Sequence, residues 1–228
     1  MNPQLQPEAT EGTRRLLYAR KDTEVQRWRQ PNGEISMLDV MRHAKPSVLI
    51  GVSGQAGAFT EEVVREMARN TLRPIIFPLS NPTSRSEAIP QNLLDWTEGR
   101  ALIGTGSPFE PATVSGRRVH IAQTNNSYIF PGLALGIVAS KARRVTDTMV
   151  KAAARELVRQ GTTQRDTDAG LLPPIADARR LSRSIAQAVG RQAIADGVAQ
   201  VTSEDALNRV LEANIWKPEY MHYEQQRG

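Results

Sequence analysis

The sequence IIFPLSNPTSRSEA, residues 75–88, decides the fold of this 228-residue chain. It begins with an apolar run that stops abruptly at SNPT, residues 80–83. A short continuous apolar run is typical of a parallel strand that is buried on both faces. Two interpretations of Asn81 are therefore open. It is either an ordinary turn residue or a side chain held at the carboxyl end of a parallel strand, where open α/β sheets bind their ligands.

The same pattern recurs on both sides of this stretch. VLIGV (residues 48–52) and ALIGT (residues 101–105) are further short apolar runs, and we expect all three runs to form adjacent parallel strands. Helical sequences separate them, and Thr60 is a suitable N-cap for the first of these helices. A fourth strand is expected at VHIA, residues 119–122.

Strands that alternate with helices indicate βαβ units in a parallel sheet. We therefore predict an α/β fold, in which a Rossmann-like parallel sheet has helices on both faces and a helical C-terminal extension. Residues 1–45 are polar and are expected to form an irregular lead-in. Residues 46–145 are expected to form the Rossmann-like core, and residues 146–228 the C-terminal helical part of the same domain.

A short polar side chain follows each predicted strand. Because the carboxyl ends of parallel strands meet at one edge of a sheet, these side chains should lie together in a concave site. An asparagine amide both donates and accepts, so it can bind a carboxylate, a hydroxyl or a carboxamide. Each residue alone is more often a turn residue, but the agreement of four strand ends favours a ligand site. The residues are Ser53, Asn81, Ser107, Asn125 and Asn126.

Composition and charge exclude several functions. The chain has no cysteine, which excludes disulfides, thiolate metal sites and thiol catalysis. No apolar run approaches the roughly 20 residues of a membrane span, and the N-terminus lacks the apolar segment of a secretory signal. We therefore expect a cytoplasmic protein without a membrane partner. The net charge of +5 comes from scattered basic residues, and only 5% of residues are aromatic, which favours a solvated basic surface over a nucleic-acid interface.

The glycine-rich sequence after the first predicted strand differs from a dinucleotide fingerprint. GVSGQAG, residues 51–57, is spaced G-x-x-G-x-x-G, whereas the fingerprint is G-x-G-x-x-G. The next predicted strand ends in Leu79-Ser80-Asn81, without the acidic residue that binds a ribose. We infer a later crossover of a nucleotide-binding sheet whose first βα unit is missing from this chain.

Four motifs together resemble the C-terminal, nucleotide-binding region of the malic enzymes, and most closely the bacterial NAD-linked type. They are GVSGQ (51–55), LSNPT (79–83), TGSPF (105–109) and NN-x-Y-x-FPG (125–132), in this order. The resemblance extends from about residue 33 to the C-terminus. It implies oxidative decarboxylation of (S)-malate to pyruvate and CO₂ with NAD or NADP, and with Mg²⁺ or Mn²⁺ in the complete enzyme. It also implies a homo-oligomer.

The resemblance assigns roles to the residues at the strand ends. Those implied to lie against the dinucleotide are Gly51, Val52, Ser53 and Asn81. Those implied to contact malate are Asn81, Asn125 and Asn126. On this interpretation, proline in the SNPT turn fixes the strand end so that Asn81 points into the site.

The chain also departs from the family pattern. Malic enzymes carry a catalytic tyrosine, a catalytic lysine and acidic metal ligands in an N-terminal region, and no tyrosine or lysine here stands in that sequence context. We therefore assign no catalytic residue and no metal ligand to this chain. Two hypotheses remain: a piece of a malic enzyme that is inactive alone, or a non-catalytic dinucleotide-binding module or subunit that acts with a partner chain. Nucleic-acid binding is a third, which salt-sensitive retention of duplex DNA would support.

Overall fold

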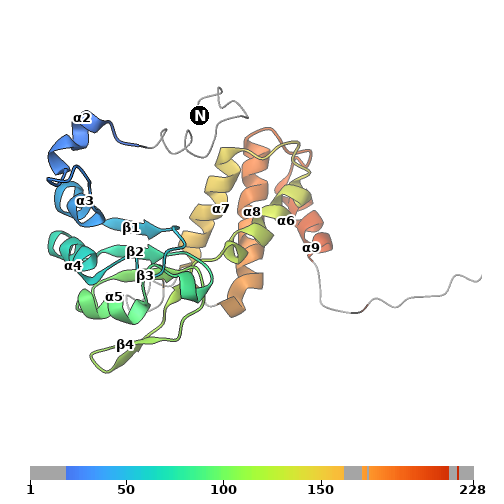
Figure 1. Ribbon diagram of the computed structural model, residues 1–228. Coiled ribbons are helices and arrows are strands. Elements are labelled where there is room, and N and C mark those ends of the chain that lie inside the picture. The colour runs from blue at the N-terminus through green and yellow to red at the C-terminus, as the bar shows by residue number, and fades with distance from the viewer. Residues whose placement is uncertain (1–18, 162–170, 174, 216–219, 221–228) are drawn as a thin grey trace, which may run out of the picture.

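The computed structural model describes residues 19–161, 171–173, 175–215 and 220 (Figure 1). Its centre is a four-stranded parallel sheet with the strand order β1-β2-β3-β6. The first three strands are β1 (Val48–Gly51), β2 (Ile75–Pro78) and β3 (Leu102–Thr105). Residue 49 pairs with 76, and 76 with 103, so the three strands are parallel neighbours. The sheet predicted from the three apolar runs is confirmed.

The predicted fourth strand, residues 119–122, is wrong in its extent. Only β6 (Ala122–Gln123) pairs in parallel with β3. Val119 belongs to β5 (Arg117–Val119), which pairs antiparallel with β4 (Ala112–Val114) in a separate hairpin. The cause is a two-residue turn, because residues 115 and 116 both have positive φ angles, 49° and 78°. The chain therefore reverses before it joins the main sheet.

Three helices cover one face of the sheet: α3 (Met37–Ala44), α4 (Glu61–Asn70) and α5 (Pro90–Trp96). The short elements α2 (Asp22–Val25) and η1 (Gln26–Trp28) precede them. Thr60 caps α4 as predicted, since its side chain accepts a hydrogen bond from the backbone of Val63. The core between these helices and the sheet contains the fully buried side chains Met67, Ile76 and Leu93.

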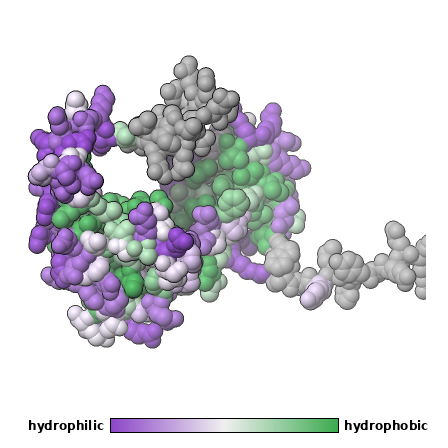
Figure 2. Space-filling model, viewed as in Figure 1, coloured by the Kyte–Doolittle hydropathy of each residue, from purple (hydrophilic) through white to green (hydrophobic). Residues whose placement is uncertain are grey.

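Helices lie on both sides of the sheet. On the side opposite α4, the C-terminal end of α7 (Asp147–Gln160) faces β2, because Leu157 and Phe77 line the same cavity. β1 is an edge strand, and no strand of the described residues pairs with its outer edge. Its apolar side chains Val48 and Ile50 are 44% and 56% exposed. Figure 2 shows apolar surface in the place that β1 occupies in Figure 1.

The C-terminal half is a helical unit beyond the carboxyl ends of the strands (Figure 1). It contains α7 together with α6 (Phe130–Ser140), η5 (Ile175–Asp177), α8 (Ala178–Ala195) and α9 (Glu204–Asn214). A Cβ atom at Gly136 would lie 2.7 Å from the carbonyl oxygen of Ala186, so glycine permits the close approach of α6 and α8. Of the helices in the described residues, none is both long and apolar enough to cross a membrane.

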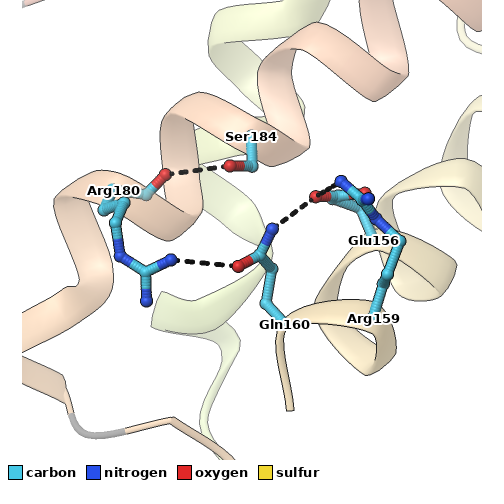
Figure 3. A network of polar contacts seen from close by, with 5 residues as sticks. All are labelled: Glu156, Arg159, Gln160, Arg180 and Ser184. Carbon is cyan, nitrogen blue, oxygen red and sulfur yellow. Dashed lines mark hydrogen bonds and ion pairs between the residues drawn. The ribbon is translucent and has the colours of Figure 1, made fainter.

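A polar network joins α7 to α8 within this unit (Figure 3). Glu156, which is 8% exposed, accepts hydrogen bonds from Arg159 at 2.8 and 2.9 Å and from Gln160 at 2.9 Å. The side-chain oxygen of Gln160 accepts in turn from Arg180 of α8, at 3.0 Å. The network therefore fixes the end of α7 against the beginning of α8.

Candidate functional site

The loops that follow β1, β2 and β3 all leave the sheet at one edge. The strands are parallel and in register, so their carboxyl ends point the same way, toward the helical unit (Figure 1). Ser53 follows β1, Asn81 follows β2 and Ser107 follows β3. The topology thus places these three residues at one edge of the sheet, which is where open α/β sheets bind ligands.

A buried carboxylate ties the first two loops together. Glu87 is completely buried, and one of its oxygens accepts hydrogen bonds from the backbone nitrogen and the hydroxyl of Ser53, at 2.8 and 2.9 Å. The hydroxyl of Ser80 donates to the same oxygen at 2.5 Å, and the backbone nitrogen of Ser80 donates to the other at 3.3 Å. The Ser80 hydroxyl also accepts from the backbone of Gly54, at 2.9 Å. We call Glu87, Ser53 and Ser80 the carboxylate clamp.

The clamp holds Glu87 in its charged form. Burial raises the pKa of this carboxyl group, but the hydrogen bonds from Ser80 and Ser53 outweigh burial and lower the pKa from 4.5 to about 2. All of these donors are neutral, so the charge is stabilised by directed hydrogen bonds instead of by a cation. The clamp therefore fixes both loops without exposing a charge at the edge.

The next loop is fixed to Asn81 directly. The hydroxyl of Ser107 donates to the side-chain oxygen of Asn81. Gly106 lies against the preceding loop so closely that a Cβ atom there would be 2.1 Å from the carbonyl oxygen of Leu79. The Asn81–Pro82 peptide bond is cis, and η2 (Thr83–Arg85) follows it. Asn81 is exposed, and within the described part of the chain its amide nitrogen makes only a long contact of 3.5 Å to Leu79. That nitrogen is therefore accessible as a hydrogen-bond donor to a ligand.

The asparagine pair lies at a separate part of the edge. Asn125 and Asn126 are exposed, and they line a cavity of about 470 Å³ whose apolar wall includes Phe77, Tyr128 and Leu157. The side-chain oxygen of Asn125 accepts from the backbone of residue 127 at 3.0 Å and so caps η3 (Asn126–Tyr128). Asn81 does not line this cavity. The structure thus brings Ser53, Asn81 and Ser107 into one framework, and the asparagine pair beside it.

The other two residues implied to contact the dinucleotide differ in exposure. Gly51 is buried, and a Cβ atom there would lie 2.6 Å from the side chain of Glu87. Any larger residue would therefore displace the clamp. Val52 is 76% exposed and presents an apolar surface at the end of β1. An exposed apolar side chain and an exposed amide at the same edge of the sheet fit a ligand with both a ring and polar groups, such as a dinucleotide.

The described residues do not form a metal site. In these parts of the chain, no three histidine or acidic side chains lie close enough together to hold a metal ion. The Mg²⁺ or Mn²⁺ ion that the family resemblance implies is therefore not matched by a donor set at this edge.

The role of Glu87 was not predicted from the sequence. Its partner Ser53 is 34 residues away, so no local pattern connects the two. One signal was available: Glu87 stands between the SNPT turn and the apolar start of α5, where an acidic residue has no capping role and is followed at once by buried Ala88. An isolated acidic residue at the end of a predicted ligand-binding loop is therefore a candidate for hydrogen bonding to a neighbouring loop.

Comparison with known proteins gives the family. The family model described as "Malic enzyme, NAD binding domain" matches residues 7–194. The chain is 51% identical, over 203 residues, to the NAD-dependent malic enzymes of Photorhabdus laumondii and Erwinia tasmaniensis. Each match covers 89% of this chain and 36% of the relative. The chain thus spans about a third of the length of these curated relatives, and the resemblance seen in its sequence is confirmed.

Solved structures give the same fold. The crystal structure of the Entamoeba histolytica malic enzyme matches with a TM-score of 0.63 and 26% identity, over 82% of this chain and 35% of that one. The malic enzyme of Pyrococcus horikoshii matches with a TM-score of 0.57 and 22% identity, over 78% of this chain and 38% of that one. The second match shows the fold alone. Together they confirm the predicted Rossmann-like α/β fold.

Proposed function

Because the chain belongs to the malic enzyme NAD-binding domain family, we propose that it forms the C-terminal NAD-binding region of an enzyme that decarboxylates (S)-malate oxidatively to pyruvate and CO₂. NAD, when bound, accepts a hydride from the carbon that carries the malate hydroxyl. One observation supports this function above the others. The carboxylate clamp and the Ser107–Asn81 hydrogen bond hold three strand-end loops at one edge, with the Asn81 amide exposed beside them.

The residues of the edge have binding roles in this proposal. The backbone of Gly51 and Ser53 and the side chain of Val52 lie against the dinucleotide. Asn81 donates a hydrogen bond to the cofactor or the substrate, and its own oxygen is held by Ser107, which fixes the orientation of the amide. Asn125 and Asn126 provide amide contacts to the carboxylate or hydroxyl of malate.

The proton transfers are assigned to other parts of the complete enzyme. Oxidative decarboxylation requires a base for the hydroxyl proton, an acid for the enolate carbon and a Lewis acid for the developing oxyanion. We propose that the catalytic tyrosine and lysine and the ligands of Mg²⁺ or Mn²⁺ lie outside this chain. The same enzyme is proposed to be a homo-oligomer. The exposed apolar side chains of the edge strand β1 are consistent with further protein covering them.

Substitution of Asn81 in a complete enzyme that contains this chain tests the binding role. Asn81→Ala should cost about 1–3 kcal/mol of transition-state stabilisation, measured as kcat/KM for malate, because a hydrogen bond in the site is lost. Asn70→Ala is the matched control, since Asn70 lies at the exposed end of α4 and its side chain donates to Glu66 of the same helix. Equal kcat/KM values for the Asn81 variant and the wild type would show that Asn81 is an ordinary turn residue without a binding role.

The isolated chain tests where the chemistry lies. We expect no malate-dependent formation of NADH or NADPH by the purified 228-residue chain, and weak dinucleotide binding at best. Turnover by the chain, in a preparation verified free of host malic enzyme, would overturn the assignment of the proton transfers to another region. Tight dinucleotide binding without turnover would instead support a binding module that acts with a partner chain.

A further inference from the structure

A second cavity lies at the opposite end of the sheet from Asn81. It has a volume of about 530 Å³, and its wall includes residues that precede the strands: Arg73 before β2, Ala101 before β3 and Ile121 before β6. The hairpin of β4 and β5 closes one side of it through Val114 and Val119. In Figure 1 this hairpin projects away from the helical unit. The cavity therefore lies at the other end of the strands from Asn81, and Leu171 lines both this cavity and the one beside Asn125 and Asn126.

Basic side chains that are scattered in the sequence gather around this cavity. They come from the loop before β2, the loop before β3 and the strand β5 with the residue that follows it. Among the residues that the structure describes, no aspartate or glutamate lines the cavity. The basic residues are Arg73, Arg100, Arg117, Arg118 and His120. Arginine side chains that gather around one cavity favour a negatively charged ligand.

The arginines differ in what holds them. Arg100 is fixed, because one of its guanidinium nitrogens donates to the carbonyl oxygens of Ala68, Thr71 and Leu72 at 3.0–3.3 Å. Arg73 and Arg118, by contrast, make no side-chain hydrogen bond and no ion pair within the part of the chain that the structure describes. Their donors remain available to a ligand.

The floor of the cavity is apolar. It includes the buried side chains of Leu94, Ile103 and Ile121. Small-molecule sites are concave and mostly apolar, with a few convergent polar groups that set specificity, and a volume of several hundred Å³ is typical of them. Guanidinium groups match the oxygens of carboxylates and phosphates in geometry and charge.

We propose that this cavity binds a small organic polyanion. Its carboxylate or phosphate oxygens meet the guanidinium groups of Arg73 and Arg118, and its carbon skeleton rests on the apolar floor between α5 and β3. Because the cavity lies at the opposite end of the strands from Asn81, such a ligand would bind together with the cofactor and not in place of it. The proposal does not depend on the reaction proposed above.

Calorimetric titration of the 228-residue chain with three defined probes tests the proposal. Phenyl phosphate and phthalate carry an apolar ring and represent the phosphate and carboxylate sources of the anion, and inorganic phosphate lacks the ring. We expect saturable binding of at least one ring-bearing probe with a Kd below about 1 mM. Its affinity should exceed that of inorganic phosphate and should weaken as ionic strength rises.

Substitutions that remove a positive charge test whether the probe binds in this cavity. Arg73→Gln and Arg118→Gln should each raise the Kd of the probe by about fivefold or more, because one charged donor is lost. Arg209→Gln is the matched control, since it removes the same charge from an exposed position on α9, outside the cavity. The circular dichroism spectrum and the melting temperature of each variant verify that it is folded. Absence of saturable binding, or equal weakening by Arg209→Gln, would overturn the proposal.

Discussion

The sheet edge and the helical unit each contain a buried carboxylate, and the two are stabilised in different ways. Glu87 at the edge accepts only from neutral groups, the backbone and hydroxyls of Ser53 and Ser80. Glu156 in the helical unit is paired with Arg159, whose side chain is 72% exposed. In both, burial raises the pKa and hydrogen bonds lower it below its ordinary value.

The difference shows how each carboxylate serves its region. The donors of Glu87 are in loops at the end of the sheet, so the carboxylate sets the relative position of those loops. Arg159 lies on the surface and can return to water if its partner is removed. The charge of Glu87 therefore fixes the loops of the site, whereas the Glu156–Arg159 pair lies within α7, and Gln160 links that helix to Arg180 of α8.

Removal of the Glu87 carboxylate should have the largest effect. Glu87→Ala removes the shared acceptor of Ser53 and of buried Ser80 and leaves a cavity where the side chain was, which should lower the free energy of unfolding by roughly 3 kcal/mol or more. Urea unfolding followed by circular dichroism measures this loss. Glu87→Gln keeps one acceptor oxygen and should recover part of it. A variant Glu87→Ala within about 0.5 kcal/mol of wild type would contradict the clamp.

The free energy of unfolding at acidic pH should also depend on Glu87. Its pKa is about 2 in the folded chain and 4.5 ordinarily, so folding favours the ionised form. The resulting stabilisation is complete above the ordinary pKa and is lost as the pH falls from 4.5 toward 2. The difference in unfolding free energy between wild type and Glu87→Gln should therefore shrink over this range. A difference that is independent of pH would show that the carboxylate charge contributes nothing.

Two glycines allow the comparison to be made without a charge. Gly106→Ala places a Cβ atom against the backbone of Leu79 at the sheet edge, and Gly136→Ala places one against the backbone of Ala186 in the helical unit. Each should cost about 1–3 kcal/mol of stability, because backbone must move to relieve the overlap. Only Gly106→Ala should also weaken cofactor binding in the complete enzyme, measured as KM for NAD. Equal effects of both on KM would mean that the edge has no special role.

The sequence predicted those parts of the fold that depend on local pattern. The apolar runs at 48–52, 75–79 and 101–105 contain the strands β1, β2 and β3, because a short continuous apolar run favours a parallel strand. The cap at Thr60 also follows from local chemistry, and its side chain accepts from the backbone nitrogen of Val63. The hairpin was missed because its signal is only Ser115-Gly116, between short polar strands.

The site was less predictable because its contacts are not local. The strand-end rule placed Ser53, Asn81 and Ser107 at one edge, and the Ser107–Asn81 hydrogen bond joins two of them. The rule gives no information about Glu87, because α4 and β2 lie between Glu87 and its partner Ser53 in the sequence. The arginines around the second cavity likewise appear unrelated in the sequence, and only the loops and the hairpin bring them together.

The smallest effect is expected for Glu156. Glu156→Gln removes the charge that pairs with Arg159, but an amide oxygen can still accept from Gln160 or Arg159, and the exposed guanidinium regains water. The expected loss of unfolding free energy is therefore about 1 kcal/mol or less. Raising the salt concentration should reduce the difference from wild type, since a largely exposed cation is involved. In the complete enzyme this variant should leave KM for NAD unchanged. Glu87→Gln should raise KM for NAD, because Glu87, unlike Glu156, holds loops at the sheet edge. If Glu156→Gln raised KM as much as Glu87→Gln does, the two carboxylates would have the same role, and the distinction between a site anchor and a helix contact would be lost.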